Sequence, residues 1–428
     1  MATPSPSVRQ AGSLDESFGE KGIWHLNIPN LRSQTTLLDV TAQSLSTLER
    51  LYFTGDAFHD SGGHYILGRL LPEGSLDKSF GVDGIVSGSL GSAPVSIGNS
   101  IILQADGKIL LIGLSGNVPV LARFFCDGKL DREFGSNGLV TLPIPQGLQA
   151  QFPGQSKRQD QDSSYSVSAS TEGKILIVKT FNNGLSPSPL AYLLNIDGSL
   201  DTSFNGKGYV QVVHPEHDPN AITMNSGYID EKGRIMVGGN LLLASGRSMP
   251  LFACYTPDGR PDPAFGNGGF VVLSSPSTQF TTVREVIRQP NNRLLALGWA
   301  GSAEQGLLIS LEPDGKANIQ FNRGQPLLTQ VDGRNTTWRN AVMQPDGKIV
   351  LLGNNHWPGE DNNVIVARLL SDAKDDLSFN DQGWVITSLG AVNRFDGLTL
   401  QDDGKIVIAG FLSTSVTQGV ILRFHGKS

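Results

Sequence analysis

One stretch of eleven residues decides the fold: GSLDKSFGVDG, Gly74–Gly84. Segments of the same pattern, Gly-x-Leu-Asp-x-Ser-Phe-Gly-x-x-Gly, occur seven times along the 428-residue chain. Their phenylalanines are Phe18, Phe80, Phe134, Phe204, Phe265, Phe321 and Phe379, so the steps between them are 62, 54, 70, 61, 56 and 58 residues. Self-similarity at a regular period is the signature of a repeat architecture. The sequence therefore predicts a repeat protein in which the most visible residues are architectural.

Between two copies of this repeat stretch, the chain reads as four short strands. In the second unit these strands are expected at Gly84–Leu90, Ser96–Gln104, Lys108–Gly113 and Val118–Phe125, with an Asp-Gly turn at residues 105–107 that favours a hairpin. The third strand is apolar at nearly every position, which indicates that both of its faces are covered. Four-stranded antiparallel sheets of this kind are typical of radially stacked propeller blades.

The two ends of the chain indicate a closed ring. The chain opens with the tail of a unit, Leu14–Leu26, and ends with Val420–Phe424, the strand that normally precedes such a tail. Two incomplete units can form one blade, which removes exposed sheet edges. We therefore predict an all-β fold, a seven-bladed β-propeller of four-stranded antiparallel blades, with the ring closed by pairing of the N- and C-terminal strands. In this prediction residues 14–428 form a single domain, and residues 1–13 are a flexible N-terminal segment.

The units resemble the delta-60 repeat, a bacterial β-propeller repeat in which the Leu-Asp-x-Ser-Phe-Gly stretch is followed by Gln-x-Asp-Gly-Lys-Ile. The match covers nearly the whole chain and is clearest at Gln104–Ile109, Gln344–Ile349 and Gln401–Ile406. Three segments depart from it: Thr47–Arg50, Gln289–Arg293 and Ala317–Phe321. The resemblance implies a propeller fold, and no chemistry comes with it.

Composition excludes several classes of partner. The net charge is −7, and Lys and Arg are scattered, whereas nucleic-acid binding needs a concentrated basic face. No apolar run approaches the roughly eighteen residues of a membrane span. Residues 1–10 lack the basic and apolar regions of a secretory signal, so we expect a cytoplasmic monomer by default, with leaderless export left open. Cys126 and Cys254 have no metal-site or disulfide spacing and are expected to be buried thiols.

The repeated charged residues have structural interpretations. An aspartate of the repeat stretch, such as Asp77, can accept hydrogen bonds from the backbone N–H groups that follow it, and the phenylalanine fits as a plug between blades. A calcium site is the alternative, but each unit offers only one or two carboxylates where calcium takes about six to eight oxygens. Four arginines share one place in the fourth strand of their units, where they could pair at blade edges or line the channel and bind an anion: Arg69, Arg123, Arg368 and Arg423.

Strand alternation separates the two faces of the predicted disc. Loops that follow the first and third strands of each unit must emerge on one face, and the Asp-Gly turns and repeat stretches on the other. The irregular loops are all of the first kind, and they comprise residues 56–64, 142–165, 181–189, 214–225 and 354–363. Variable loops on a rigid scaffold commonly carry binding sites. We therefore expect the site on this face, called here the variable-loop face.

Two groups of residues on this face are candidate sites. The first suits sugar recognition, because aromatic rings stack on the C–H faces of sugars while carboxylates bind hydroxyls, although the tryptophans could instead pack loops onto the blades. It comprises Trp299, Trp338, His356, Trp357, Glu360 and Asp361. The second is a weaker candidate for a divalent cation, in a loop with no helix to hold it. It comprises His214, Glu216, His217 and Asp218. No other cofactor is predicted.

Enzyme motifs do not stand out. There is no Gly-x-Ser-x-Gly elbow, no His-Glu-x-x-His and no phosphate-cradling loop. We expect a non-catalytic propeller that recognises a partner protein or a glycan through the variable-loop face. The alternative is a propeller enzyme, a hydrolase or lyase acting on a carbohydrate or lactone, with His and carboxylates at the channel mouth.

Overall fold

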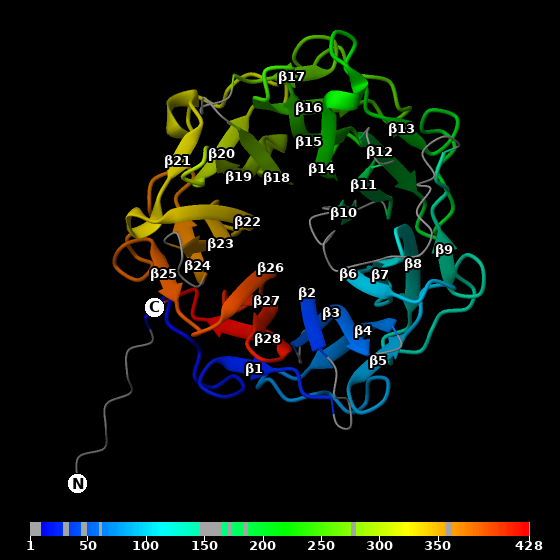
Figure 1. Ribbon diagram of the computed structural model, residues 1–428, viewed down its shortest axis with the longest axis vertical. Coiled ribbons are helices and arrows are strands. Elements are labelled where there is room, and N and C mark those ends of the chain that lie inside the picture. The colour runs from blue at the N-terminus through cyan, green and yellow to red at the C-terminus, as the bar shows by residue number, and fades with distance from the viewer. Residues whose placement is uncertain are drawn as a thin grey trace.

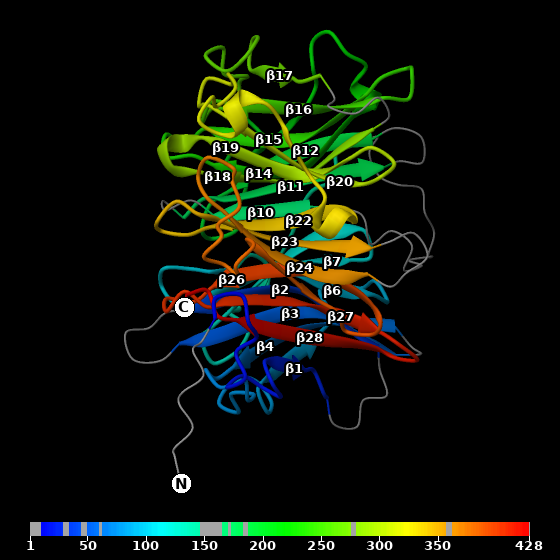
Figure 2. The same ribbon diagram turned by 90° about the vertical axis from the view of Figure 1, so that its left-hand side faces the viewer.

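Seven four-stranded antiparallel sheets surround a central axis, and the strands run between the two faces of the ring (Figures 1 and 2). The computed structural model describes residues 10–28, 34–43, 49–59, 62–145, 165–169, 173–182, 187–274, 280–356 and 362–427. The predicted fold, an all-β seven-bladed propeller, is confirmed.

Each blade starts with its innermost strand, and the next three strands follow outward. Blade 1 consists of β2 (Gln34–Gln43), β3 (Arg50–His59), β4 (Gly62–Leu70) and β5 (Ile85–Gly88). Blade 2 consists of β6 (Ser96–Leu103), β7 (Ile109–Ser115), β8 (Val118–Phe124) and β9 (Leu139–Thr141). Blade 3 consists of β10 (Tyr165–Ala169), β11 (Ile175–Asn182), β12 (Pro187–Leu194) and β13 (Tyr209–Gln211). Blade 4 consists of β14 (Ile222–Ile229), β15 (Ile235–Leu242), β16 (Ser248–Tyr255) and β17 (Phe270–Val272).

The remaining blades have the same order. Blade 5 consists of β18 (Thr281–Arg288), β19 (Leu294–Ala300), β20 (Gln305–Leu311) and β21 (Leu327–Thr329). Blade 6 consists of β22 (Asn335–Met343), β23 (Ile349–His356), β24 (Asn363–Leu369) and β25 (Trp384–Thr387). Blade 7 consists of β26 (Val392–Leu400), β27 (Ile406–Ser413), β28 (Thr417–Phe424) and β1 (Ile23–His25). Short 3-10 helices are η2 (Pro219–Ala221), η3 (Pro290–Asn292), η4 (Asn322–Gly324) and η5 (Val331–Gly333).

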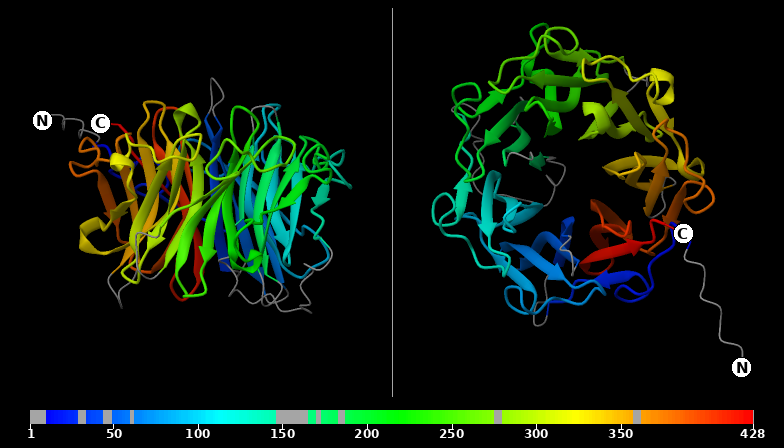
Figure 3. Two further views of the ribbon diagram at one scale, coloured as in Figure 1. Left: turned by 90° about the horizontal axis from the view of Figure 1, so that it is seen from above. Right: turned by 180° about the vertical axis from the view of Figure 1, so that it is seen from behind.

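Blade 7 closes the ring with strands from both ends of the chain (Figure 3). Strand β1 pairs antiparallel with β28, and Ile23 lies opposite Leu422 while His25 lies opposite Val420. The predicted closure by the N- and C-terminal strands is therefore confirmed. Without β1, the backbone groups of β28 would form an open sheet edge.

The hydrophobic core is divided into seven clusters, one at each interface between neighbouring blades. Each cluster contains one phenylalanine of the repeat stretch, and all seven are at most 1% exposed. Strand β7 explains the continuous apolar runs, because Ile109 and Leu111 pack toward blade 1 while Leu110 and Ile112 pack toward blade 3. The prediction that the phenylalanines plug the blade interfaces is confirmed.

The aspartates of the repeat stretch are used in turns. Asp77 Oδ1 accepts a hydrogen bond from the backbone N–H of Ser79 at 3.0 Å, and the other six blades have the same bond at 3.0–3.2 Å. In blade 5 the acceptor is Asn318, which departs from the repeat pattern but accepts from Gln320 in the same way. These side chains therefore stabilise the turn that leads from the third strand to the outermost one.

The four repeated arginines lie at blade interfaces. Arg123 Nε lies 2.8 Å from Asp131 Oδ2, its guanidinium carbon lies 4.5 Å from the ring centre of Phe134, and its Nη1 donates to Ile196 O of blade 3 at 3.0 Å. The equivalent arginines of blades 1, 6 and 7 each make the same three contacts. Each arginine therefore joins its own blade to the next one, and the pairing interpretation is confirmed.

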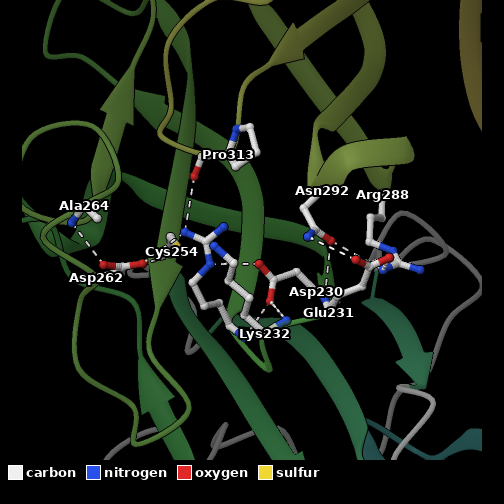
Figure 4. Close-up of polar contacts among 10 residues, drawn as sticks. Asp230, Glu231, Lys232, Cys254, Asp262, Ala264, Arg288, Asn292 and Pro313 are labelled. Atoms are coloured by element: carbon white, nitrogen blue, oxygen red, sulfur yellow. Dashed lines mark hydrogen bonds and ion pairs between the residues drawn. The ribbon is translucent and has the colours of Figure 1, made fainter.

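Blade 4 makes the same connection with a different residue. Cys254 occupies the arginine place there, beside Asp262 (Figure 4). The guanidinium comes instead from Arg234, which immediately precedes β15. Arg234 contacts Asp230 at 2.8 Å and Asp262 at 3.1 Å, and its Nη1 donates to Pro313 O of blade 5 at 3.2 Å. The position of the guanidinium group is therefore determined by the aspartate of the repeat stretch in the same blade and by a backbone carbonyl of the next blade.

Candidate functional site

Trp338 of the predicted aromatic group is part of the core. It is 1% exposed, lies in the cluster between blades 5 and 6, and donates from Nε1 to Thr329 Oγ1 at 2.9 Å. Gly306 leaves room for it, because a Cβ at that position would lie 2.4 Å from Trp338 Nε1. For Trp338, the packing interpretation therefore describes the observed contacts.

The rest of the aromatic group is spread over the strand ends of blades 5 and 6. Trp299 in β19 and His356 at the end of β23 are partly exposed. His356 Nε2 lies 3.8 Å from Glu304 Oε2, a carboxylate that we did not predict for this group. Trp357, Glu360 and Asp361 lie outside the described residues.

Trp338 also lines a groove of about 470 Å³ between β21 of blade 5 and β24 and β25 of blade 6. Trp384, the first residue of β25, is partly exposed in it, and Thr329, Gln330, Lys374 and Asp375 supply polar groups. Burial raises the pKa of Asp375. The remaining lining residues are Leu327, Leu328, Val331, Ala367, Leu369 and Ala373. The groove therefore combines an aromatic ring, an apolar wall and several hydrogen-bonding groups.

The side chains of the predicted metal candidate organise their own loop. His214 is buried, with its ring centre 4.5 Å from that of His217, and its Nδ1 accepts from the backbone N–H of Glu216 at 3.1 Å. Burial, followed by the charge of His217, lowers the pKa of His214. Asp218 caps η2 by accepting from Asn220 N at 2.9 Å. Within the described ranges, no group of three or more His, Cys, Asp and Glu side chains is placed to hold a metal ion.

The expectation of two buried cysteines is wrong for Cys126. Cys254 is buried, whereas Cys126 is exposed. Strand β8 ends at Phe124, so Cys126 lies in the following turn, where Phe125 N–H bonds to Lys129 O.

A group of charged residues meets at the axis of the ring. Six innermost strands contain a β-bulge, and in blades 2, 4, 5, 6 and 7 the extra residue lies five positions before the Gln or Asp that begins the next turn. The bulge residues are Leu38, Asn99, Asn225, Arg284, Arg339 and Asp396. Bulges redirect side chains and are common beside functional sites. In blades 5, 6 and 7 this position is charged.

Asp396 is the centre of this group. Arg394 Nε lies 2.6 Å from its Oδ2, Arg339 Nη1 3.2 Å from its Oδ1, and Arg284 Nη2 3.4 Å from its Oδ1. Because Arg284 belongs to blade 5 and Asp396 to blade 7, these side chains can meet only near the axis. Burial would raise the pKa of Asp396, but Arg394, Arg339 and Arg284 together hold it well below its usual range. We call Arg284, Arg339, Arg394 and Asp396 the axis cluster.

Two further carboxyl groups lie on innermost strands near the axis cluster. Burial raises the pKa of Glu285 to about 8; Arg284 opposes this shift, and Asp39 and Asp396 add to it. Burial also raises the pKa of Asp39 to about 6, although Ile101 N and Ser100 Oγ donate to its carboxylate at 2.9 and 2.8 Å. We did not predict these residues, and the signal that could have found them is their constant spacing from the following turn.

Comparison with known proteins agrees with the fold. Two segments, residues 104–134 and 233–265, match the model of a family described as "Domain of unknown function (DUF5122) beta-propeller". No curated protein matches the chain. None of the helices in the described ranges is long and apolar enough to cross a membrane.

The solved structures that the chain is similar to are distant from it in sequence. The extracellular domains 1–2 of Drosophila Semaphorin 1b are 10% identical, with a TM-score of 0.46 over 97% of this chain and 87% of that chain. The polysaccharide lyase Uly1 is 9% identical, with a TM-score of 0.48 over 98% of both chains. The PQQ-bound aldose sugar dehydrogenase from Streptomyces coelicolor is 12% identical, with a TM-score of 0.43 over 78% of this chain and 96% of that chain. These similarities concern the fold alone.

Proposed function

We propose that the protein is a non-catalytic binding propeller of the delta-60 type, which recognises a glycan or a partner protein. Its contact surface comprises the variable-loop face and the groove between blades 5 and 6. The single observation that carries the proposal is this groove, with Trp384 partly exposed beside polar side chains. Its volume of about 470 Å³ lies within the range of roughly 300–1,000 Å³ that is usual for small-ligand sites.

The chemistry of the groove favours a sugar. The ring of Trp384 and the side chains of Leu327 and Leu328 provide an apolar surface against which a pyranose C–H face can pack. Gln330 and Asp375 offer an amide and a carboxylate to the sugar hydroxyls. Trp338 forms part of the wall and is held by its bond to Thr329, which keeps the groove preorganised.

A glycan array followed by calorimetric titration of the best ligand tests this proposal. Trp384→Ala should weaken glycan binding by about tenfold or more, because the stacking surface is lost. Tyr209→Ala is the matched control, since Tyr209 begins the outermost strand of blade 3, as Trp384 does in blade 6. Equal binding by both variants would show that the groove is not the site. A protein partner that crosslinks to the groove, with no glycan bound, would support the partner-protein form of the proposal.

One observation favours the alternative, a hydrolase or lyase acting on a carbohydrate or lactone. Glu285 carries a carboxyl group whose pKa is raised to about 8 beside a group of arginines, and perturbed carboxyl groups of this kind are common in active sites. Such an enzyme would turn over a neutral or acidic oligosaccharide, and Glu285→Gln would abolish turnover while leaving the fold intact. Binding without turnover by the wild-type protein would exclude this alternative for the ligand tested.

A further inference from the structure

The groove between blades 5 and 6 contains a carboxylate at a position that is apolar in the other blades. Asp375 is the third residue of the blade 6 repeat stretch. The residues at this position in the other six blades are Leu14, Leu76, Leu130, Leu200, Pro261 and Ala317. All seven form the same antiparallel bridge to the end of the third strand, and the four leucines pack against hydrophobic clusters. An aspartate at this position therefore gives up apolar packing that other blades use.

The Asp375 side chain lines the groove together with Trp384. Gly383, which precedes Trp384, lies so close that a Cβ on it would be 2.7 Å from Asp375 Cβ. Asp375 is exposed, and its carboxylate forms no ion pair or hydrogen bond with any residue in the described ranges. Lys374, which also lines the groove, instead places its Nζ 2.6 Å from Asp372 Oδ2. The described part of the groove thus contains a negative charge that its own lysine does not pair with.

A second departure from the repeat lines the same groove. Ala373 has a φ of 76°, a left-handed backbone conformation in which the other six blades have glycine with φ of 84–93°. A Cβ is unfavourable in this conformation, so alanine costs folding stability there. Blade 6 therefore departs twice from the repeat at the groove, and each departure works against the fold. Departures of this kind are expected where a protein binds its ligand.

We propose that the groove binds an amino sugar, a glycan unit with a free, protonated amine, through Asp375 and Trp384. This inference rests on the function proposed above and narrows its ligand to one class. The carboxylate accepts hydrogen bonds from the ammonium group, and such charge-assisted bonds are stronger than bonds to neutral hydroxyls. The indole face of Trp384 attracts the same positive charge while it packs against the C–H face of the sugar ring. An acidic or sulfated sugar would be repelled by the same carboxylate.

Calorimetric titration of the full-length protein with the β-1,4-linked glucosamine tetramer and with its fully N-acetylated form tests the inference. The titrations are done slightly below neutral pH, where the free amines carry charge. We expect the glucosamine tetramer to bind about fivefold or more tightly than the N-acetylated one, on the scale of a hydrogen bond to a charged group. Equal or tighter binding of the N-acetylated tetramer would overturn the inference and leave the proposed glycan binding standing. Absence of binding by both tetramers would also overturn it, whereas the proposed function fails only if the glycan array and crosslinking find no ligand either.

Two substitutions of Asp375 and one control assign the preference to this carboxylate. Asp375→Asn should bind both tetramers equally, because the charge is lost while the shape is kept. Asp375→Leu restores the residue of blades 1, 2, 3 and 7, so it should lose the preference and raise the midpoint of thermal unfolding. Asp83→Asn is the matched control, since Asp83 is an exposed aspartate in the repeat stretch of blade 1 and its removal changes the net charge equally.

The control separates the groove from general attraction between an acidic protein and a cationic sugar. Asp83→Asn should keep the preference for the glucosamine tetramer. A preference that persists in either Asp375 variant, or that disappears in Asp83→Asn, would overturn the inference. A lower unfolding midpoint for Asp375→Leu would contradict the stability cost from which the inference starts.

Discussion

Replacement of Asp15 by Asn should weaken the junction that closes the ring. Asp15 lies near the N-terminus and pairs with Arg423 of β28, with 2.9 Å between Oδ2 and Nε. The two side chains are only 4% and 3% exposed, and the Arg423 guanidinium carbon lies 4.4 Å from the ring centre of Phe18. Asn keeps the shape and an acceptor for the Ser17 N–H, so the substitution chiefly removes the charge.

The size of the effect follows from the pKa of Asp15. Burial would raise this pKa, but the Ser17 hydroxyl and the Arg423 charge outweigh it and lower the value from 3.8 to about 2. A shift of roughly two units corresponds to about 2.5 kcal/mol of folding free energy, at about 1.36 kcal/mol per unit. Because the folded-state pKa is lowered, this contribution is present above pH 3.8 and is lost as the pH falls toward 2.

Urea unfolding of wild type and Asp15→Asn between pH 7 and the lowest pH at which both fold measures this difference. We expect Asp15→Asn to be about 2–3 kcal/mol less stable at pH 7, with the gap narrowing below pH 4. Asp376→Asn is the matched control, because Asp376 makes the same contacts with Arg368 in blade 6 and its pKa is also lowered to about 2. Only Asp15→Asn should accelerate hydrogen exchange at residues 420–422 of β28, where β1 is paired. A gap that stays constant as the pH falls would refute the linkage, and unchanged exchange would refute the role in closure.

Two other substitutions test the interior. Gly306→Ala should lower the free energy of unfolding by about 1–3 kcal/mol in urea titrations, because the new Cβ would lie 2.4 Å from Trp338 Nε1; an unchanged midpoint would mean that the strand moves aside without cost. Glu285→Gln should stabilise the protein near neutral pH, because the folded-state pKa of the Glu285 carboxyl is raised from 4.5 to about 8 and the wild type therefore loses folding free energy as the pH rises through this range, about 3 kcal/mol at pH 7. Parallel pH–stability curves for wild type and Glu285→Gln would contradict the raised pKa.

The fold was predictable because its signals are local and repeated. The phenylalanine of each repeat stretch is buried at a blade interface, and the aspartate two residues before the bonded N–H makes the same turn in blade after blade. Closure of the ring was also predictable, because residues 22–26 match the outermost strand of other blades, and β1 pairs with β28 as predicted. Each of the seven repeated units therefore supports the same prediction.

The candidate sites were less predictable. Trp338 stood out as an aromatic residue, yet its place opposite Gly306 made it part of the core. The groove beside it depends on how β21 and β25 of two different blades are spaced, which no local pattern describes. In blade 4, Arg234 makes the contacts that an arginine of the third strand makes in other blades. This equivalence can be recognised only in the structure, where Arg234 contacts Asp262 and the backbone carbonyl of Pro313.

The sequence by itself determined the number of blades and the closure of the ring, because the repeat period, the strand pattern and the turn residues are all visible along the chain. Only the tertiary structure decided which charges meet. Arg284, Arg339 and Asp396 are separated by 55 and 57 residues, and they come together only because each lies at the bulge of an innermost strand in a closed ring. Contacts between blades depend on the closed ring, and the sequence of a single repeat does not predict them.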